Sequence, residues 1–161
     1  MVWQTICSQQ GMVISAYSFE LESDLSKLET LRQHLVDYGK VTGLSRACLF
    51  DINVCLDEIF TNIVSYGFTD ESAHLISFTV KAVGYELIID IEDDGVPFNP
   101  LEAKDPMVPE DLVHLKIGGL GIYIVKKLMD EVCYKRKQGK NKLTLKKCID
   151  ISLMGDMPQK N

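Results

Sequence analysis

The sequence predicts an α+β fold, a two-layer sandwich in which a mixed β-sheet carries helices on one face. Apolar residues recur with helical spacing in three segments and alternate with polar residues in several shorter ones. The order of these segments is strand, helix, helix, two strands, a long aperiodic stretch, helix and two strands. Two helices in a row, and strands in pairs, favour a sheet with helices on one side.

Length and composition indicate one globular domain. The chain has 161 residues, of which 46% are apolar and 25% are charged. We expect residues 1–155 to form a single domain and residues 156–161 to be a C-terminal tail. The five cysteines form no CxxC pair, so reduced and mostly buried thiols are expected rather than a zinc cluster or a disulfide framework.

The charge of the chain argues against two classes of partner. The net charge is −6 and the pI is about 5.0, whereas proteins that hold phosphate backbones are normally basic. Direct nucleic-acid binding is therefore not expected. No stretch approaches the roughly 20 apolar residues of a membrane span, and residues 1–11 do not resemble a signal peptide. We expect a cytoplasmic protein that does not bind a membrane.

The first half of the chain predicts a strand and two helices. Residues 12–21 alternate loosely and predict the first strand. Ser23 or Asp24 can cap the first helix, which Gly39 can end. The second helix is predicted over residues 46–66. The apolar faces of the two helices consist of Leu25, Leu28, Leu31 and Leu35 in the first and Ile52, Leu56, Ile59 and Ile63 in the second.

The second half predicts two hairpins separated by a long loop. Residues 76–82 and 87–91 alternate in polarity around Gly84, which predicts the first hairpin. Residues 95–119 lack periodicity and hold four of the five prolines, and a functional lid is predicted at about residues 100–117. A helix resumes near residue 120, and strands at about 132–137 and 142–149 close the chain.

The long helix carries the first of three segments that can support chemistry. Glu58 and Asn62 are four residues apart and share a helix face at the edge of the apolar stripe. A carboxylate can orient or deprotonate a nucleophile, and an amide oxygen can bind Mg²⁺. The alternative is an ordinary solvated helix face.

The other two segments flank the predicted lid. Asp93 and Gly95 follow a buried strand, where the carboxylate can accept a hydrogen bond from an exocyclic amine such as that of adenine. The alternative is a plain Asp-Gly turn. Gly118, Gly119 and Gly121 open a helix, and free N–H groups at a helix N-terminus bind anions. The alternative is a flexible joint.

In this order and at these separations, the three segments resemble the GHKL (Bergerat) ATP-binding fold, the fold of the histidine-kinase-like ATPase superfamily. The match is closer to its branch of anti-sigma regulatory factors and serine-protein kinases. Residues 58–62 resemble the N-box of that branch, and DDGVPF at 93–98 resembles its DxGxxF box. The resemblance covers roughly residues 12–150 and includes the segment NKLTL at 141–145.

The resemblance implies ATP and Mg²⁺ as ligands and gives each residue a role. Asp93 and Gly95 would bind adenine with Thr144 nearby, and Asn62 would hold Mg²⁺ through its side-chain oxygen. The implied phosphate ligands are Gly118, Gly119 and Gly121. Glu58 would orient or activate the hydroxyl of the substrate serine.

The implied function is a serine/threonine-protein kinase that phosphorylates an anti-sigma-factor antagonist domain and sequesters a sigma factor. A homodimer is a further expectation, since relatives tend to dimerise. The alternative is an ATP-dependent switch that binds a protein partner without phosphorylating it. A histidine-kinase fragment fits less well, because the sequence has no phosphoacceptor-histidine helix and the 93–98 box lacks the DxGxG form.

One charged segment is left without a role. Residues 135–147 hold seven of the 17 Lys and Arg residues and fall on the second predicted hairpin. Basic hairpins are usually just solvated; otherwise this one could dock an acidic partner.

Overall fold

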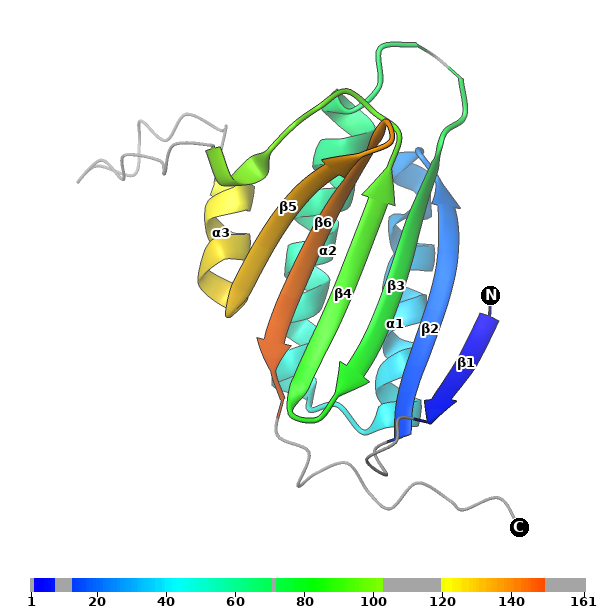
Figure 1. Cartoon of the computed structure of the whole chain (residues 1–161), viewed down its shortest axis with the longest axis vertical. Coiled ribbons are helices and arrows are strands. Elements are labelled where there is room, and N and C mark those ends of the chain that lie inside the picture. Colours follow the sequence, from blue (N-terminus) through cyan, green and yellow to red (C-terminus); the bar gives the residue numbers. More distant parts are fainter. Residues whose placement is uncertain (1, 8–12, 71, 103–119, 150–161) are drawn as a thin grey trace, which may run out of the picture.

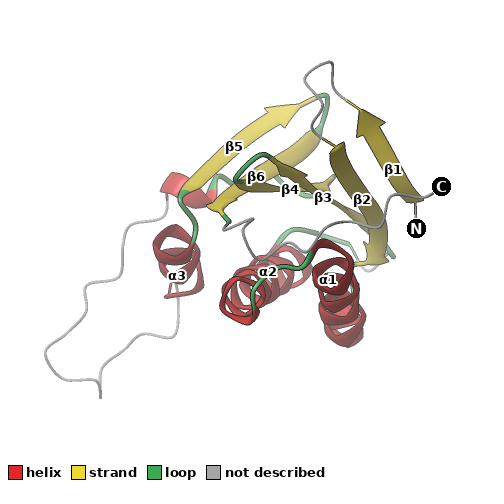
Figure 2. Cartoon of the chain, turned by 90° about the horizontal axis from the view of Figure 1, so that it is seen from below, coloured by secondary structure: helices red, strands yellow, loops and turns green. Residues whose placement is uncertain are grey.

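The computed structural model describes residues 2–7, 13–70, 72–102 and 120–149, which form two layers (Figure 1). One layer is a six-stranded sheet with strand order β1-β2-β3-β4-β6-β5, and three helices cover one of its faces (Figure 2). The predicted α+β class with helices on one face is therefore confirmed. The elements are β1 (Val2–Cys7), β2 (Val13–Glu22), α1 (Leu28–Thr42), α2 (Arg46–Tyr66), β3 (Leu75–Val83), β4 (Glu86–Asp93), α3 (Leu120–Leu128), β5 (Glu131–Lys137) and β6 (Lys140–Cys148), with short 3₁₀ turns η1 (Leu25–Lys27) and η2 (Pro100–Glu102).

Neighbouring strands in the described sheet are antiparallel throughout, so the expectation of a mixed sheet is wrong. The crossover through α3 does make β5 run parallel to β4, but the two strands are not neighbours. A tight turn at Gln138 and Gly139, both with positive φ, returns β6 into the space between them. The structure also adds β1, which the sequence analysis did not predict, next to the predicted first strand.

The start of the helical layer differs from the prediction at one glycine. Asp24 caps η1 by accepting a hydrogen bond from the backbone of Ser26, and α1 then continues through Gly39 to Gly43, where φ is 71°. The expected helix end at Gly39 is wrong. A Cβ at Gly39 would lie 2.6 Å from Cδ1 of Leu49, so this glycine allows close packing of α1 against α2.

The core lies between the helices and the covered face of the sheet. The predicted helix over residues 46–66 is confirmed as α2, which Ser45 caps and which contacts both α1 and α3. No helix among the described residues is long and apolar enough to cross a bilayer. The fully buried residues include Leu31, Tyr38, Ile52, Leu56, Phe60, Ile76, Phe78, Leu87, Ile89, Ile91 and Leu145.

Replacement of Phe78 by alanine should test which face of the sheet the helices cover. The Phe78 side chain is 0% exposed and its ring stacks on that of Phe19, at 5.0 Å between centroids. Phe78→Ala should lower the free energy of unfolding in urea by about 3–5 kcal/mol. Thr79→Ala, the next residue on the open face, should cost less than about 1 kcal/mol. Equal losses from the two variants would contradict the arrangement.

Candidate functional site

The face of α2 that carries Glu58 and Asn62 is turned toward α3. The N-terminal turn of α3 approaches Glu58 so closely that a methyl group on Gly121 would overlap Oε2 of the carboxylate. Only a glycine fits this contact without movement. The half-buried Asn62 lies one helical turn further along, and none of the described residues hydrogen-bonds its side-chain amide. The amide oxygen is therefore available as a ligand for a cation such as Mg²⁺.

Asp93 ends β4 on the face of the sheet that the helices cover. Its side chain is buried, at 6% exposure, and Oδ1 accepts hydrogen bonds from the backbone N–H of Gly95 at 2.8 Å and from Nδ2 of Asn141 at 2.7 Å. No described residue donates a hydrogen bond to Oδ2. The carboxylate is thus held in a defined orientation with one oxygen left for a ligand, an arrangement that fits an exocyclic amine.

Gly95 joins this carboxylate to the end of α2. A Cβ on Gly95 would overlap the carbonyl oxygen of Gly67, and the next residue, Val96, donates its backbone N–H to the same oxygen at 2.7 Å. The chain after β4 therefore passes directly against the C-terminus of α2. Any side chain at position 95 would force the two backbones apart.

Asn141 on β6, which the sequence analysis did not single out as a ligand-site residue, organises this end of the sheet. Its Oδ1 accepts hydrogen bonds from the hydroxyl of Tyr134 at 2.7 Å and from Nη1 of Arg136 at 2.6 Å. Its Nδ2 donates to Oδ1 of Asp93 and, at 3.0 Å, to the carbonyl oxygen of Val96. The amide is 7% exposed and uses both of its polar atoms to hold neighbouring segments.

Thr144 occupies a different place from the one expected. It pairs with Asp90 on β4, whereas Asp93 pairs with Asn141, and residues an odd number of positions apart on a strand point to opposite faces. Thr144 therefore lies on the open face, where its hydroxyl donates to Oδ1 of Asp90 at 2.7 Å. The expected position beside Asp93 is wrong. Asn141 points to the same face of β6 as the buried Leu143 and Leu145. A polar residue in this alternating apolar series was the sequence feature that could have identified Asn141 as a site residue.

The phosphate end of the predicted site is only partly described. Gly121 lies in the first turn of α3, whereas Gly118, Gly119 and residues 103–117 of the predicted lid lie outside the described residues. The structure brings together Glu58 with Gly121, and Asp93 with Gly95. Asn62 lies on α2 between Glu58, which contacts Gly121, and Gly67, which contacts Gly95, so these predicted residues are arranged along one helix; Thr144 is not among them.

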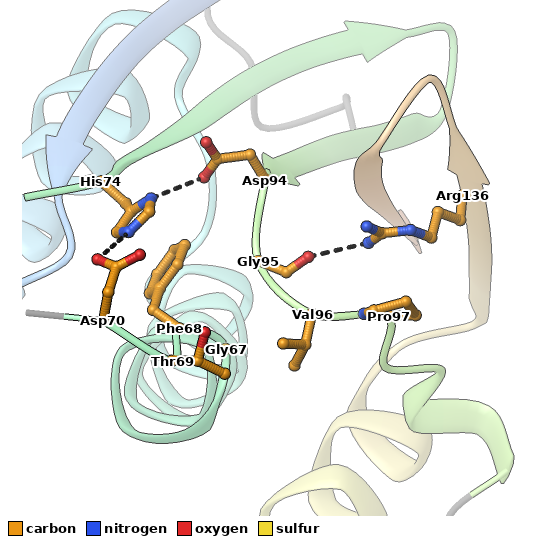
Figure 3. A pocket seen from close by; sticks show the side chains of 10 residues that line it. All are labelled: Gly67, Phe68, Thr69, Asp70, His74, Asp94, Gly95, Val96, Pro97 and Arg136. Atoms are coloured by element: carbon orange, nitrogen blue, oxygen red, sulfur yellow. Dashed lines mark hydrogen bonds and ion pairs between the residues drawn. The ribbon is translucent and has the colours of Figure 1, made fainter. Parts of the chain in front are cut away.

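A cavity of about 300 Å³ borders this site without containing its principal residues (Figure 3). Figure 3 shows His74 between two carboxylates, with Nε2 3.0 Å from Asp70 and Nδ1 3.1 Å from Asp94. The ring of Phe68 stacks on the imidazole at 4.0 Å. The described residues that line it are Gly67, Phe68, Thr69, Asp70, His74, Asp94, Gly95, Val96, Pro97 and Arg136, a set without Glu58, Asn62 or Asp93.

The two carboxylates change the acid–base behaviour of the histidine. The hydrogen bond to Asp70 is the largest cause that raises the pKa of His74 above its ordinary value; desolvation opposes it, and the hydrogen bond to Asp94 adds to the rise. The hydroxyl of Ser72 and the imidazole of His74 lower the pKa of Asp70 to about 2. His74 therefore bridges the loop after α2 and the segment after β4, and its protonated form makes an ion pair with each carboxylate.

The stability of the fold should depend on pH through His74. Because its folded pKa is raised, its contribution is complete below the unfolded pKa of about 6.5 and is lost as the pH rises through the folded pKa. Urea unfolding should show this decline in the wild type and not in His74→Gln. His34→Gln is the control, because desolvation lowers the pKa of His34 and places its titration at lower pH. An NMR titration midpoint of His74 at or below about 6.5 would contradict the bridge.

Comparison with known proteins identifies the family to which this fold belongs. A family model described as a histidine kinase-like ATPase domain matches residues 21–147. Serine/threonine-protein kinase BtrW of Bordetella bronchiseptica is 32% identical over 96 residues, which cover 60% of this chain and 68% of that protein. Serine-protein kinase RsbW of Listeria monocytogenes is also 32% identical over 96 residues, covering 56% of this chain and 60% of that protein.

Two further matches extend the comparison. Serine-protein kinase RsbW of Bacillus cereus is 27% identical over 120 residues, covering 72% of this chain and 74% of that protein. A crystal structure of the RsbU and RsbW domains of Rv1364c from Mycobacterium tuberculosis shares the fold, with a TM-score of 0.60 and 15% identity over 83% of this chain and 32% of that one. Since the family model spans most of the sequence, the chain belongs to the histidine kinase-like ATPase domain family, as the resemblance to the GHKL superfamily predicted.

Proposed function

We propose that this chain binds Mg·ATP and acts as a serine-protein kinase on a protein partner. The observation that carries the proposal is the buried carboxylate of Asp93, with Oδ1 held by Gly95 and Asn141 and no described donor for Oδ2. A buried carboxylate is stabilised by each hydrogen bond to its oxygens, and the exocyclic amine of adenine can supply one.

The names of the relatives support protein serine as the phosphate acceptor. The resemblance in sequence extends this proposal to particular partners, namely an anti-sigma-factor antagonist domain that carries the acceptor serine and a sigma factor that the chain sequesters in the cytoplasm. Because the chain spans only 60–74% of these relatives, their full activities are proposals for it.

In this proposal Asn62 and Glu58 on α2 have separate roles. Asn62 would hold Mg²⁺, which would neutralise charge on the phosphate oxygens. The glycines at the start of α3 would present N–H groups to the same phosphates. Glu58 would orient the serine hydroxyl and take its proton as the serine oxygen bonds to the γ-phosphorus, while the bond from that phosphorus to the β-phosphate oxygen breaks and ADP leaves.

One contact favours the second candidate, an ATP-dependent binding switch without transfer. Glu58 lies against Gly121 at the N-terminus of α3, where a carboxylate stabilises the helix through its dipole. A carboxylate with that role would be needed for structure and not for chemistry. The two candidates therefore predict different effects on phosphoryl transfer when the charge of Glu58 is removed.

The adenine contact is tested by Asp93→Asn. An amide places an NH₂ group either toward the N–H of Gly95 and the Nδ2 of Asn141 or toward the amine of adenine, so one set of hydrogen bonds is lost. We expect calorimetry to show Mg·ATP affinity weakened by at least about tenfold, equivalent to about 1.4 kcal/mol. Asp94→Asn is the matched control, since that carboxylate bonds His74 and should leave the affinity within about twofold. Equal affinities in Asp93→Asn and the wild type would refute the adenine role.

The kinase and switch candidates are separated by Glu58→Gln. If Glu58 is the general base, this variant should retain nucleotide affinity and lose about 10²–10⁴-fold in phosphoryl transfer. Asn62→Ala should impair both nucleotide binding and transfer. The assay measures phosphoserine on an antagonist domain encoded by the same organism. A wild type that binds ATP and that domain without transfer would support the switch instead, and an unimpaired Glu58→Gln would refute its role as base.

A further inference from the structure

The β5–β6 hairpin concentrates positive charge that the proposed nucleotide site does not use. Seven of the 17 Lys and Arg residues fall within residues 135–147, and no Asp or Glu occurs from 132 to 149. This happens in a chain whose net charge is −6. The local charge therefore opposes that of the molecule as a whole.

Four of these seven side chains have partners within the fold. Lys142 pairs with Asp90 and Glu92, Lys146 with Glu131, Lys147 with Asp51, and Arg136 bonds Gly95 and Asn141. The remaining three are Lys135, Lys137 and Lys140, which are exposed and have no hydrogen bond or ion pair with the described residues. We call these three lysines the basic tip.

The register of the hairpin places like charges against each other. Lys135 lies opposite Lys142 on the open face, and Lys137 lies opposite Lys140 beside the turn. Like charges directly opposite each other on neighbouring strands are destabilising. Asp90 and Glu92 offset the charge of Lys142, whereas Lys137 and Lys140 have no carboxylate partner among the described residues, so an anion over the tip would chiefly relieve the repulsion between these two. The arrangement therefore favours a negatively charged partner.

We propose that the basic tip is a docking surface for an acidic segment of a protein partner. A second copy of this chain is not the expected partner, because pairing of two β5 edge strands would bring lysine against lysine. Lysines on edge strands generally prevent such pairing. A nucleic-acid backbone would extend beyond three lysines onto an acidic protein and meet Asp90 and Glu92 on the same open face. A short acidic peptide segment matches the size and the sign of the surface.

The basic tip also adjoins the proposed nucleotide site. Arg136, between two of its lysines in sequence, donates from Nη1 to the carbonyl oxygen of Gly95 at 3.0 Å (Figure 3). A segment bound at the tip would therefore lie at the same end of the sheet as the chain that follows Asp93. The proposal goes beyond nucleotide binding and is tested without nucleotide, so its failure and that of the kinase proposal are separate results.

The test is an NMR titration of the ¹⁵N-labelled full chain with a capped Glu-Ser repeat peptide. We expect amide shifts concentrated in residues 133–142, with affinity falling about tenfold in the triple variant Lys135→Gln, Lys137→Gln, Lys140→Gln. The matched control is Lys27→Gln, Lys40→Gln, Arg46→Gln, which removes the same charge elsewhere and should stay within about twofold of the wild type. The tip variant should also melt at a higher temperature than the wild type, because its cross-strand repulsion is gone.

Three results would overturn the proposal. One is a set of peptide shifts spread over lysines throughout the chain, and another is equal weakening by the two triple variants. The third comes from an oligouridylate of matched charge titrated in parallel: if it binds residues 133–142 more tightly than the peptide, the surface recognises phosphate backbones. Spectra of both variants before titration confirm that each is folded, so weakened binding reports on the surface.

Discussion

The hydrogen bond from Asn141 to Asp93 is the contact on which the candidate site depends. It joins β6 to β4 inside the covered face of the sheet, and it fixes one oxygen of the carboxylate while leaving the other for a ligand. The same amide holds the chain after β4 through Val96 and is itself held by Tyr134 and Arg136. Loss of this amide would leave Oδ1 of the buried Asp93 carboxylate with one of its two hydrogen bonds, at a cost of about 1.5–3 kcal/mol for a hydrogen bond to a charged group.

Close contacts at three glycines extend this arrangement across the helical layer. Three glycines let α2 make near contacts along its length: Gly39 with Leu49 near its start, Gly121 with Glu58 at its middle, and Gly95 with Gly67 at its end. A Cβ at Gly95 would overlap the backbone of Gly67, whereas one at Gly39 or Gly121 would require the side chain of Leu49 or Glu58 to move. These contacts hold α2 against α1, α3 and the segment after β4. The positions of Glu58 and Asn62 follow from the position of this helix.

The sequence predicted well those elements whose structure depends on a local pattern of residues. The apolar stripe of α2 and the alternation of β3 and β4 identified these elements, and three separate motifs identified the family. Other features depend on contacts between distant residues. Gly39 was predicted to end a helix because glycine commonly does so. Its actual role, to make room for the side chain of Leu49 on α2, depends on a contact that the sequence does not show. Thr144 was predicted to lie near the ligand because the sequence does not show which residues of β6 point to the covered face. The register of β6 with β4, which pairs Thr144 with Asp90, places it on the open face. The antiparallel sheet follows from the position of β6, which the predicted order of elements left open.

The central claim is that one nucleotide contacts the end of β4, the face of α2 and the start of α3 together. The most direct measurement is an NMR titration of the labelled chain with Mg·ATP. We expect the amides of Asp93–Val96, Asn141, Glu58–Asn62 and Gly121 to shift with one common dissociation constant. Unchanged amides at Asp93 and Asn141, or shifts confined to another surface, would contradict the account.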